Sequence, residues 1–135
     1  MMRKVLLPLL FVTAMTMLPS VARAEGRIFE LRTYTTLEGK LPALQARFRD
    51  DTTRIFKKHG IEVIGYWVPE DGDKAKNTFV YIVAHPSRAA ATQNWKDFAA
   101  DPEWKKVAAE SEKNGKIVDH IESVFLDALP FSPLK

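Results

Sequence analysis

Alternating hydrophobic and polar residues predict four β-strands and two helical segments in this chain. The strand pattern is clearest in residues 28–35, IFELRTYT, where successive side chains point to opposite faces. One face collects Phe29, Leu31 and Thr33, and the other collects Glu30, Arg32 and Tyr34. We interpret the first set as the core face of the strand. The second set then places a carboxylate, a guanidinium and a phenol in a row on the opposite face.

A helix is predicted over residues 40–59, because its apolar residues recur at helical spacing. Those residues are Leu41, Leu44, Phe48, Ile55 and Phe56. Gly60 follows immediately, and glycine is common directly after the last residue of a helix. The basic residues before it interact favourably with the negative end of the helix dipole. Residues 61–68 and 78–84 then predict two strands joined by the charged turn 70–74, which together form an antiparallel hairpin.

The second helical segment is predicted in two parts. Ser87 can cap a helix that begins at Arg88, and Asp101 followed by Pro102 is a strong start signal for a second helix that ends near Gly115. Residues 117–126 predict the fourth strand. The order β-α-β-β-α-β is that of the ferredoxin-like α+β fold, a four-stranded antiparallel sheet with strand order 4-1-3-2 and both helical segments on one face.

This topology leaves one face of the sheet without helices. If the first strand turns Phe29 and Leu31 toward the helices, the open face carries an aromatic and charged set: Tyr34, Tyr81 and Trp67 with Glu30, Arg32, His120 and Glu122. Such a face is too aromatic to meet water, and we expect a second copy of the chain to cover it. The expected assembly is a homodimer in which two sheets form an α/β barrel.

The first 24 residues predict a secretory signal peptide. Arg3 and Lys4 precede an apolar run of about 14 residues, and Ala22-Arg23-Ala24 has the small-x-small pattern of a cleavage site. A retained membrane anchor is the weaker interpretation, because a membrane-spanning helix needs about 20 apolar residues. Cleavage after Ala24 would place the mature protein in the periplasm or outside the cell, with no membrane attachment.

Removing the signal segment changes the charge of the chain. Three of the 20 basic residues lie in it and none of the 17 acidic ones, so the formal net charge falls from +3 to zero. A nucleic-acid partner therefore has no electrostatic support. The absence of cysteine excludes disulfides and thiolate metal sites. Residues 25–135 have the size of a single domain.

Several segments in the same order resemble the NIPSNAP family: residues 28–34, IFELRTY; Lys58-His59-Gly60; Gly65-Tyr66-Trp67; residues 81–84, YIVA; the run from Trp95 to Trp104; and residues 122–126, ESVFL. The resemblance covers about residues 27–135. It implies the dimeric α/β-barrel superfamily, whose ferredoxin-like protomers pair through their sheets. The family has no agreed catalytic residues, so the resemblance assigns no site.

The candidate site residues come from the polar row and its expected neighbours. His120 is the first candidate for a general base, Glu122 and Glu30 for an acid or base, and Arg32 for holding an anionic group, while Tyr34, Trp67 and Tyr81 would form an aromatic wall. Alternatively, the charged residues form a structural ion-pair network at the dimer interface. The scattered histidines predict no metal site, and we predict no cofactor, although a haem bound by one histidine stays open.

Two classes of function follow. The first is a secreted or periplasmic homodimer that binds a small ligand or serves as an interaction module. The alternative is a cofactor-poor enzyme, monooxygenase- or dehydratase-like, that acts on a small molecule in the barrel cavity, as other members of the superfamily do.

Overall fold

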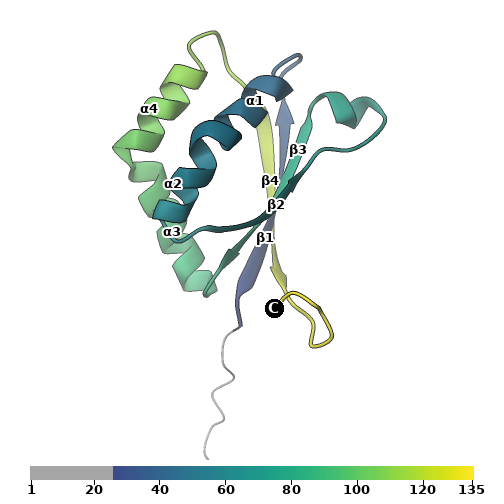
Figure 1. Cartoon of the computed structure of the whole chain (residues 1–135), viewed down its shortest axis with the longest axis vertical. Helices are drawn as coiled ribbons and strands as arrows, with labels where there is room; N and C mark the ends of the chain where they lie inside the picture. Colours follow the sequence, from purple (N-terminus) through teal and green to yellow (C-terminus); the bar gives the residue numbers. More distant parts are fainter. Residues whose placement is uncertain (1–25) are drawn as a thin grey trace, which may run out of the picture.

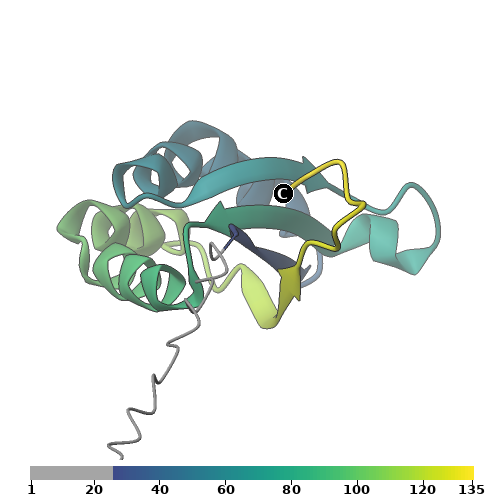
Figure 2. The same ribbon diagram turned by 90° about the horizontal axis from the view of Figure 1, so that it is seen from below.

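The computed structural model describes residues 26–135, so the predicted signal peptide lies outside the described residues. In this part of the chain, one four-stranded antiparallel sheet carries the α-helices on one of its faces (Figures 1 and 2). The strand order is β2-β3-β1-β4, as the topology predicts, and it places β1 between β3 and β4. The strands are β1 (Ile28–Thr36), β2 (Glu62–Trp67), β3 (Thr78–His85) and β4 (Val118–Asp127).

The predicted first helix is a single helical segment with an irregular centre. It consists of α1 (Leu41–Arg47), a π-helical turn (Phe48–Thr52) and α2 (Thr53–Lys58). Each of the five apolar residues predicted to face the sheet is buried. Gly60 has a φ of 73°, a left-handed conformation that glycine adopts without steric cost and that ends the helix.

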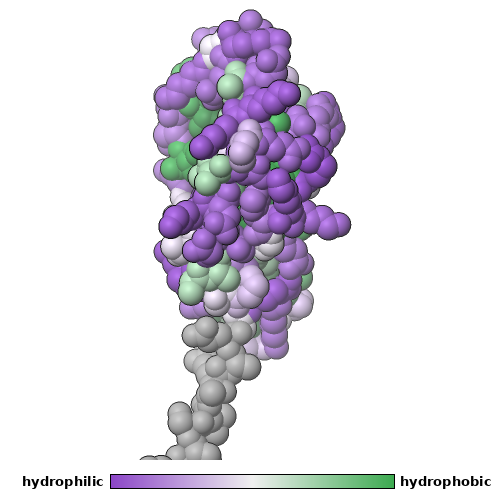
Figure 3. Space-filling view, turned by 90° about the vertical axis from the view of Figure 1, so that its left-hand side faces the viewer, coloured by the Kyte–Doolittle hydropathy of each residue, from purple (hydrophilic) through white to green (hydrophobic). Residues whose placement is uncertain are grey.

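The second helical segment is divided as predicted. Ser87 caps α3 (Arg88–Ala100) by accepting a hydrogen bond from Ala90 N, and Asp101 caps α4 (Pro102–Ser111) by accepting one from Glu103 N at 2.8 Å. The hairpin turn between β2 and β3 contains a short 3₁₀ helix (Asp73–Lys76). Seen from the helical side, the outer surface of the molecule is mainly hydrophilic (Figure 3).

An aromatic core fills the space between the sheet and the helices. Phe48 lies at its centre and packs against five other aromatic rings at centroid distances of 4.8–5.9 Å, namely Tyr34, Phe56, Tyr66, Phe79 and Tyr81. Edge-on and tilted arrangements of this kind are favoured by the ring quadrupoles. The core therefore includes side chains of β1 and β3 that the sequence pattern assigned to the opposite face.

The face of the sheet without helices is apolar. The exposed fraction reaches 53% for Val124, 50% for Trp67 and 39% for Leu126, and the half-buried side chains of Leu31, Val80 and Ile82 lie on the same face by strand register. Residues 129–134 cross one end of this face (Figure 2). With Phe29 and Ile64, they line an apolar groove of about 470 Å³. No other segment of residues 26–135 covers the rest of the apolar face.

Candidate functional site between the sheet and the helices

The polar row of β1 faces the helices and not the open face of the sheet. Glu30 is 1% exposed and Tyr34 is 7% exposed, and both lie beneath the helical layer. Tyr81 of β3 is opposite Arg32 in the strand register and lies on the same side. The predicted placement of Glu30, Arg32, Tyr34 and Tyr81 on the open face is therefore wrong. The large rings need the volume between sheet and helices, whereas Leu31 and Thr33 fit the flatter open face.

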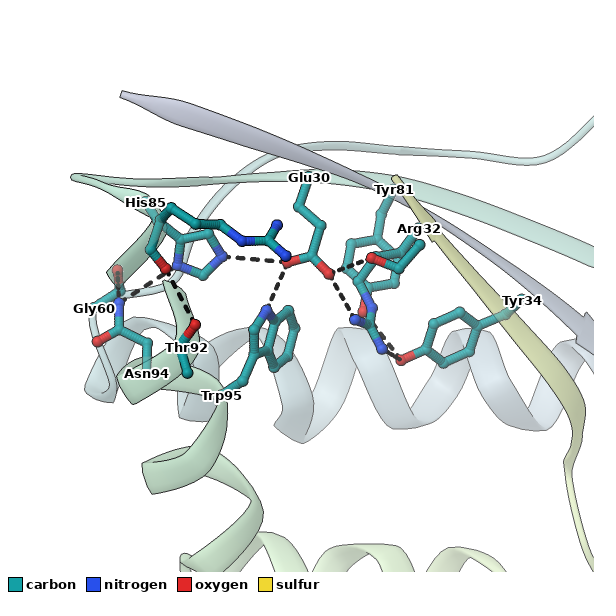
Figure 4. Close-up of polar contacts among 11 residues, drawn as sticks. Glu30, Arg32, Tyr34, Gly60, Tyr81, His85, Thr92, Asn94 and Trp95 are labelled. Carbon is teal, nitrogen blue, oxygen red and sulfur yellow. Dashed lines mark hydrogen bonds and ion pairs between the residues drawn. The ribbon is translucent and has the colours of Figure 1, made fainter. Parts of the chain in front are cut away.

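Glu30 is the most densely hydrogen-bonded side chain of the site (Figure 4). Its carboxylate accepts hydrogen bonds from Trp95 Nε1 at 2.6 Å, Ser123 Oγ at 2.6 Å and Arg32 Nη1 at 2.7 Å. Burial alone would raise the pKa of Glu30, but the nearby His85 and the hydrogen bonds from Ser123, Arg32 and Trp95 outweigh it and lower the pKa from 4.5 to about 2. Glu30 is therefore a fixed anion at neutral pH.

His85 supports Glu30 from the end of β3. It is fully buried, and its Nε2 lies 3.5 Å from Glu30 Oε2, a long contact for a hydrogen bond. The amide of Asn94 bridges His85 Nδ1 at 3.4 Å and the carbonyl of Gly60 at 3.3 Å (Figure 4). An amide donor at Nδ1 favours the tautomer whose Nε2 proton points at the carboxylate. His85 directly precedes Pro86 in the sequence, and it is the last residue of β3 in the structure.

Arg32 connects the carboxylate to a pair of tyrosines. Its Nη2 lies 3.5 Å from Tyr34 Oη, which is hydrogen-bonded to Tyr81 Oη at 3.0 Å. Burial would lower the pKa of Arg32, but its tyrosine neighbours and Glu30 raise it above the ordinary value, so the guanidinium stays charged. Burial raises the pKa of Tyr81, which stays a neutral phenol. The guanidinium also lies 4.5 Å from the centre of the Trp95 ring.

Arg47 is a second buried cation, and it is not among the predicted site residues. It is the last residue of α1 and is 8% exposed. Its Nη1 lies 3.3 Å from Ser111 Oγ and 3.7 Å from Glu112 Oε1. Burial lowers the pKa of Arg47, and Tyr34, Glu112 and Tyr81 partly oppose this effect. Its position three residues after Leu44, on the buried stripe of the helix, is the signal that could have identified it.

The structure separates the other predicted site residues from this cluster. Strand register places His120 opposite Thr35 and Glu122 opposite Thr33, so both lie on the open side of β4. Both are exposed, and His120 contacts Asp119 at 2.8 Å. Trp67 also lies on the open face, as predicted. The predicted constellation is thus divided between the two faces of the sheet.

The arrangement is suited to binding, because it holds one fixed anion, two arginines and two phenols in a largely buried setting. Within residues 26–135, no group of three or more His, Cys, Asp or Glu side chains lies close enough together to hold a metal ion. The helices of this part of the chain are also too short or too polar to cross a membrane.

The fold and the sequence together define the class of this protein. The architecture is that of ferredoxin-like α+β proteins, and the family model for NIPSNAP matches residues 29–133. The chain belongs to the NIPSNAP family. None of the curated proteins compared with it matches.

Solved structures of the same family are similar over most of the chain. A NIPSNAP family protein of unknown function from Agrobacterium tumefaciens is 27% identical with a TM-score of 0.70, and the match covers 82% of this chain and 96% of that one. An uncharacterised NIPSNAP domain protein from Burkholderia xenovorans is 26% identical with a TM-score of 0.66, over 78% of this chain and 98% of that one.

A more distant structure shares the fold alone. SnoaB, a cofactor-independent oxygenase from Streptomyces nogalater, is 15% identical with a TM-score of 0.52, over 80% of this chain and 98% of that one.

Proposed function

We propose that this protein is an exported homodimeric module that binds a small molecule. Two copies pair through their open sheet faces, and each protomer carries a binding site in the cluster around Glu30 and Arg32. The main support for this pairing is the apolar character of the open face. An exposed patch that includes Trp67, Val124 and Leu126 is unusual for a monomer and typical of an interface.

The fixed charge of Glu30 favours binding over acid–base catalysis. A carboxylate whose pKa lies at about 2 and which already accepts three short hydrogen bonds is a poor proton acceptor at neutral pH. The same contacts hold Arg32 in one orientation, which lowers the entropic cost of binding a ligand. The fold shared with SnoaB keeps a cofactor-poor enzyme as the alternative, with His120 and Glu122 as its remaining acid–base candidates.

Light scattering after size-exclusion chromatography tests the pairing. The mature protein should elute as a dimer at micromolar concentration, and Val124→Lys should shift it to a monomer because a charge cannot be buried unpaired at the interface. Leu37→Lys is the matched control, since Leu37 is an exposed leucine in the turn after β1. A monomeric wild-type protein, or a dimer unaffected by Val124→Lys, would contradict the proposal.

A thermal-shift screen tests the binding function. Some small molecule in a panel that includes haem and flavin should raise the melting temperature of the wild-type protein and leave that of Arg32→Met unchanged. A panel without any such compound would count against a binding site in this cluster.

Export is tested separately by sequencing the N-terminus of the protein recovered from the periplasm of a bacterial host. The mature protein should begin at Glu25.

A further inference from the structure

The part-buried Arg32 and the buried Arg47 both leave hydrogen-bonding capacity unused. Each guanidinium carries five N–H donors. Among residues 26–135, Arg32 donates to Glu30 and Tyr34, and Arg47 donates to Ser111. The buried Nε atoms of both arginines have no hydrogen-bond partner there. Buried donors without partners are rare in native proteins, and the oxygens of an anionic ligand would satisfy both of them.

The charge of Arg47 is less well compensated than that of Arg32. Glu30 neutralises Arg32, which is 2.7 Å away. The nearest carboxylate to Arg47 belongs to Glu112, whose oxygen is 3.7 Å away on a side chain that is 42% exposed. A nearly buried cation with so little compensation is destabilising by itself. An additional anion near Arg47 would remove that cost.

A continuous aromatic wall joins the two cations. Arg32 lies 4.5 Å from the ring centre of Trp95, and Arg47 lies 5.3 Å from that of Trp104. Between the two tryptophans lies Phe98, whose ring centre is 5.9 Å from that of Trp95 and 4.6 Å from that of Trp104. Both tryptophans are only half-buried. An apolar or aromatic ligand body can therefore pack on the exposed parts of the two tryptophans, which the buried Phe98 supports from below, while an acidic group reaches the arginines.

The edge strand β4 leaves this region open to solvent. Ile121 is opposite Tyr34 and Ser123 is opposite Arg32, so both side chains point toward the helical side of the sheet. Ile121 is nevertheless 44% exposed, and Ser123 is exposed as well. The helices thus do not cover the sheet as far as β4, and a ligand can approach from this edge.

The backbone at Arg47 is irregular in a way that is often associated with function. Arg47 immediately precedes the π-helical turn Phe48–Thr52, where Thr52 Oγ1 bonds back to the carbonyl of Arg47 at 3.1 Å. Short π-helical insertions in α-helices occur frequently at functional sites. Here the turn lies directly after the residue that carries the incompletely paired guanidinium.

We propose that the site binds a small organic carboxylate with an apolar or aromatic body, and that Arg32 and Arg47 hold its carboxylate while Trp95 and Trp104 pack against its body. The planar guanidinium matches a carboxylate in bidentate geometry. This inference rests on the proposed binding function and names its ligand class. It adds Arg47 as a ligand-binding residue.

The test compares acids with their neutral amides on the mature protein. Benzoate and indole-3-acetate are the probes, benzamide and indole-3-acetamide are the neutral controls of the same shape, and inorganic phosphate is the alternative anion. Thermal shift gives the first readout and isothermal titration calorimetry the dissociation constant. At least one of the acids should bind at least about tenfold more tightly than its amide, because only the acid makes charge-assisted hydrogen bonds.

Two arginine variants separate ligand binding from folding. Arg47→Met should abolish acid binding, and the ligand-free variant should be as stable as the wild-type protein or more so, because an incompletely paired buried charge is removed. Arg49→Met is the matched control: Arg49 lies two residues further on, 71% of its side chain is exposed, and it should bind the acids like the wild-type protein.

Each other outcome overturns a defined part of the inference. Binding of the amides as tight as that of the acids would keep a small-molecule site and overturn the carboxylate. If phosphate bound in an Arg47-dependent way and neither acid bound, the small-molecule site would likewise be kept and the carboxylate overturned. Acid binding retained in Arg47→Met would overturn the role of Arg47, and binding of no probe by a dimeric protein would overturn the inference without touching the pairing. Acid binding by a monomeric protein would contradict only the pairing.

Discussion

Arg32 Nη1 and Glu30 Oε1 are 2.7 Å apart on the helical side of β1, and the carboxylate of the pair is almost completely buried. Alternation along a strand puts residues i and i+2 on the same face, so the central strand of the sheet holds both partners itself. The pair therefore forms wherever β1 forms. It anchors the hydrogen bonds that connect the sheet to α3 through Trp95.

A double-mutant cycle on Glu30→Gln and Arg32→Met should give a coupling free energy of about 2 kcal/mol, because breaking a buried pair leaves one charge without compensation. Urea unfolding of the four proteins measures it. The same cycle on Arg27→Met and Glu62→Gln is the control, since that pair has the same kind of contact at 2.8 Å but is solvent-exposed. Equal coupling free energies in the two cycles would contradict the claim that burial makes the Glu30–Arg32 pair more important for stability than an exposed pair.

The lowered pKa of Glu30 predicts how stability depends on pH. Because its pKa is about 2 in the folded state and ordinarily 4.5, the unfolded chain takes up the proton first as the pH falls. The contribution of Glu30, roughly 3 kcal/mol, is present above pH ~4.5 and is lost as the pH falls toward 2.

Glu30→Gln should therefore reduce the acid-side slope of the free energy of unfolding, measured by urea titrations between pH 2 and 7. The slope should not vanish, since the pKa of Asp101 is also held well below its usual range by Lys58 and His59. Glu38→Gln, a change in an exposed turn, should keep the wild-type slope. An unchanged slope in Glu30→Gln would show that the carboxylate is not specially stabilised in the folded protein.

Asp101→Ala should lower the urea midpoint more than any exposed acid-to-alanine change on the same helical segment. Asp101 caps α4 and its Oδ2 lies 2.8 Å from Lys58 Nζ and 2.6 Å from His59 Nε2, so it also joins α2 to α4. Asp97→Ala is the control, because Asp97 is exposed on α3 and contacts only Gln93 among the described residues. Equal effects of the two substitutions would contradict this linking role.

Gly65→Ala should weaken association while it leaves the protomer folded. A Cβ atom at Gly65 would lie 2.7 Å from the indole of Trp67, so the exposed ring on the open face would have to move. We expect the dimer dissociation constant to rise at least about tenfold, because displaced aromatic anchors are costly at interfaces. Sedimentation equilibrium measures the constant, and urea unfolding checks the fold. An unchanged constant would place Trp67 outside the interface.

The fold could be predicted from the sequence because its local signals agree with one another. Helical spacing in residues 40–59, the start signal at Asp101 and Pro102, and the alternation in the strands all indicate the same topology. Each strand begins and ends within one residue of its predicted position. These signals come from residues that are close together in the chain, so they can be identified in a single sequence.

The assignment of the two faces could not be predicted in the same way. A face is usually identified by contrast between apolar and polar residues, and here both faces are rich in apolar side chains. Leu31 and Phe29 are hydrophobic but lie on the open side, whereas Glu30 and Arg32 are charged but buried because each satisfies the other. Arg47 was not predicted as a site residue, because an arginine is not expected among the buried apolar residues of a helix. The exceptions gather at the candidate site.

The central claim, that the open faces of two copies meet, is tested most directly by distances between spin labels. The chain has no cysteine, so one introduced cysteine gives one label for each protomer. Labels at Glu122→Cys on the open face should be markedly closer across the dimer than labels at Lys106→Cys on α4, as double electron–electron resonance measures. Longer distances between the Glu122 labels, or no dipolar coupling at either position, would contradict sheet-to-sheet pairing.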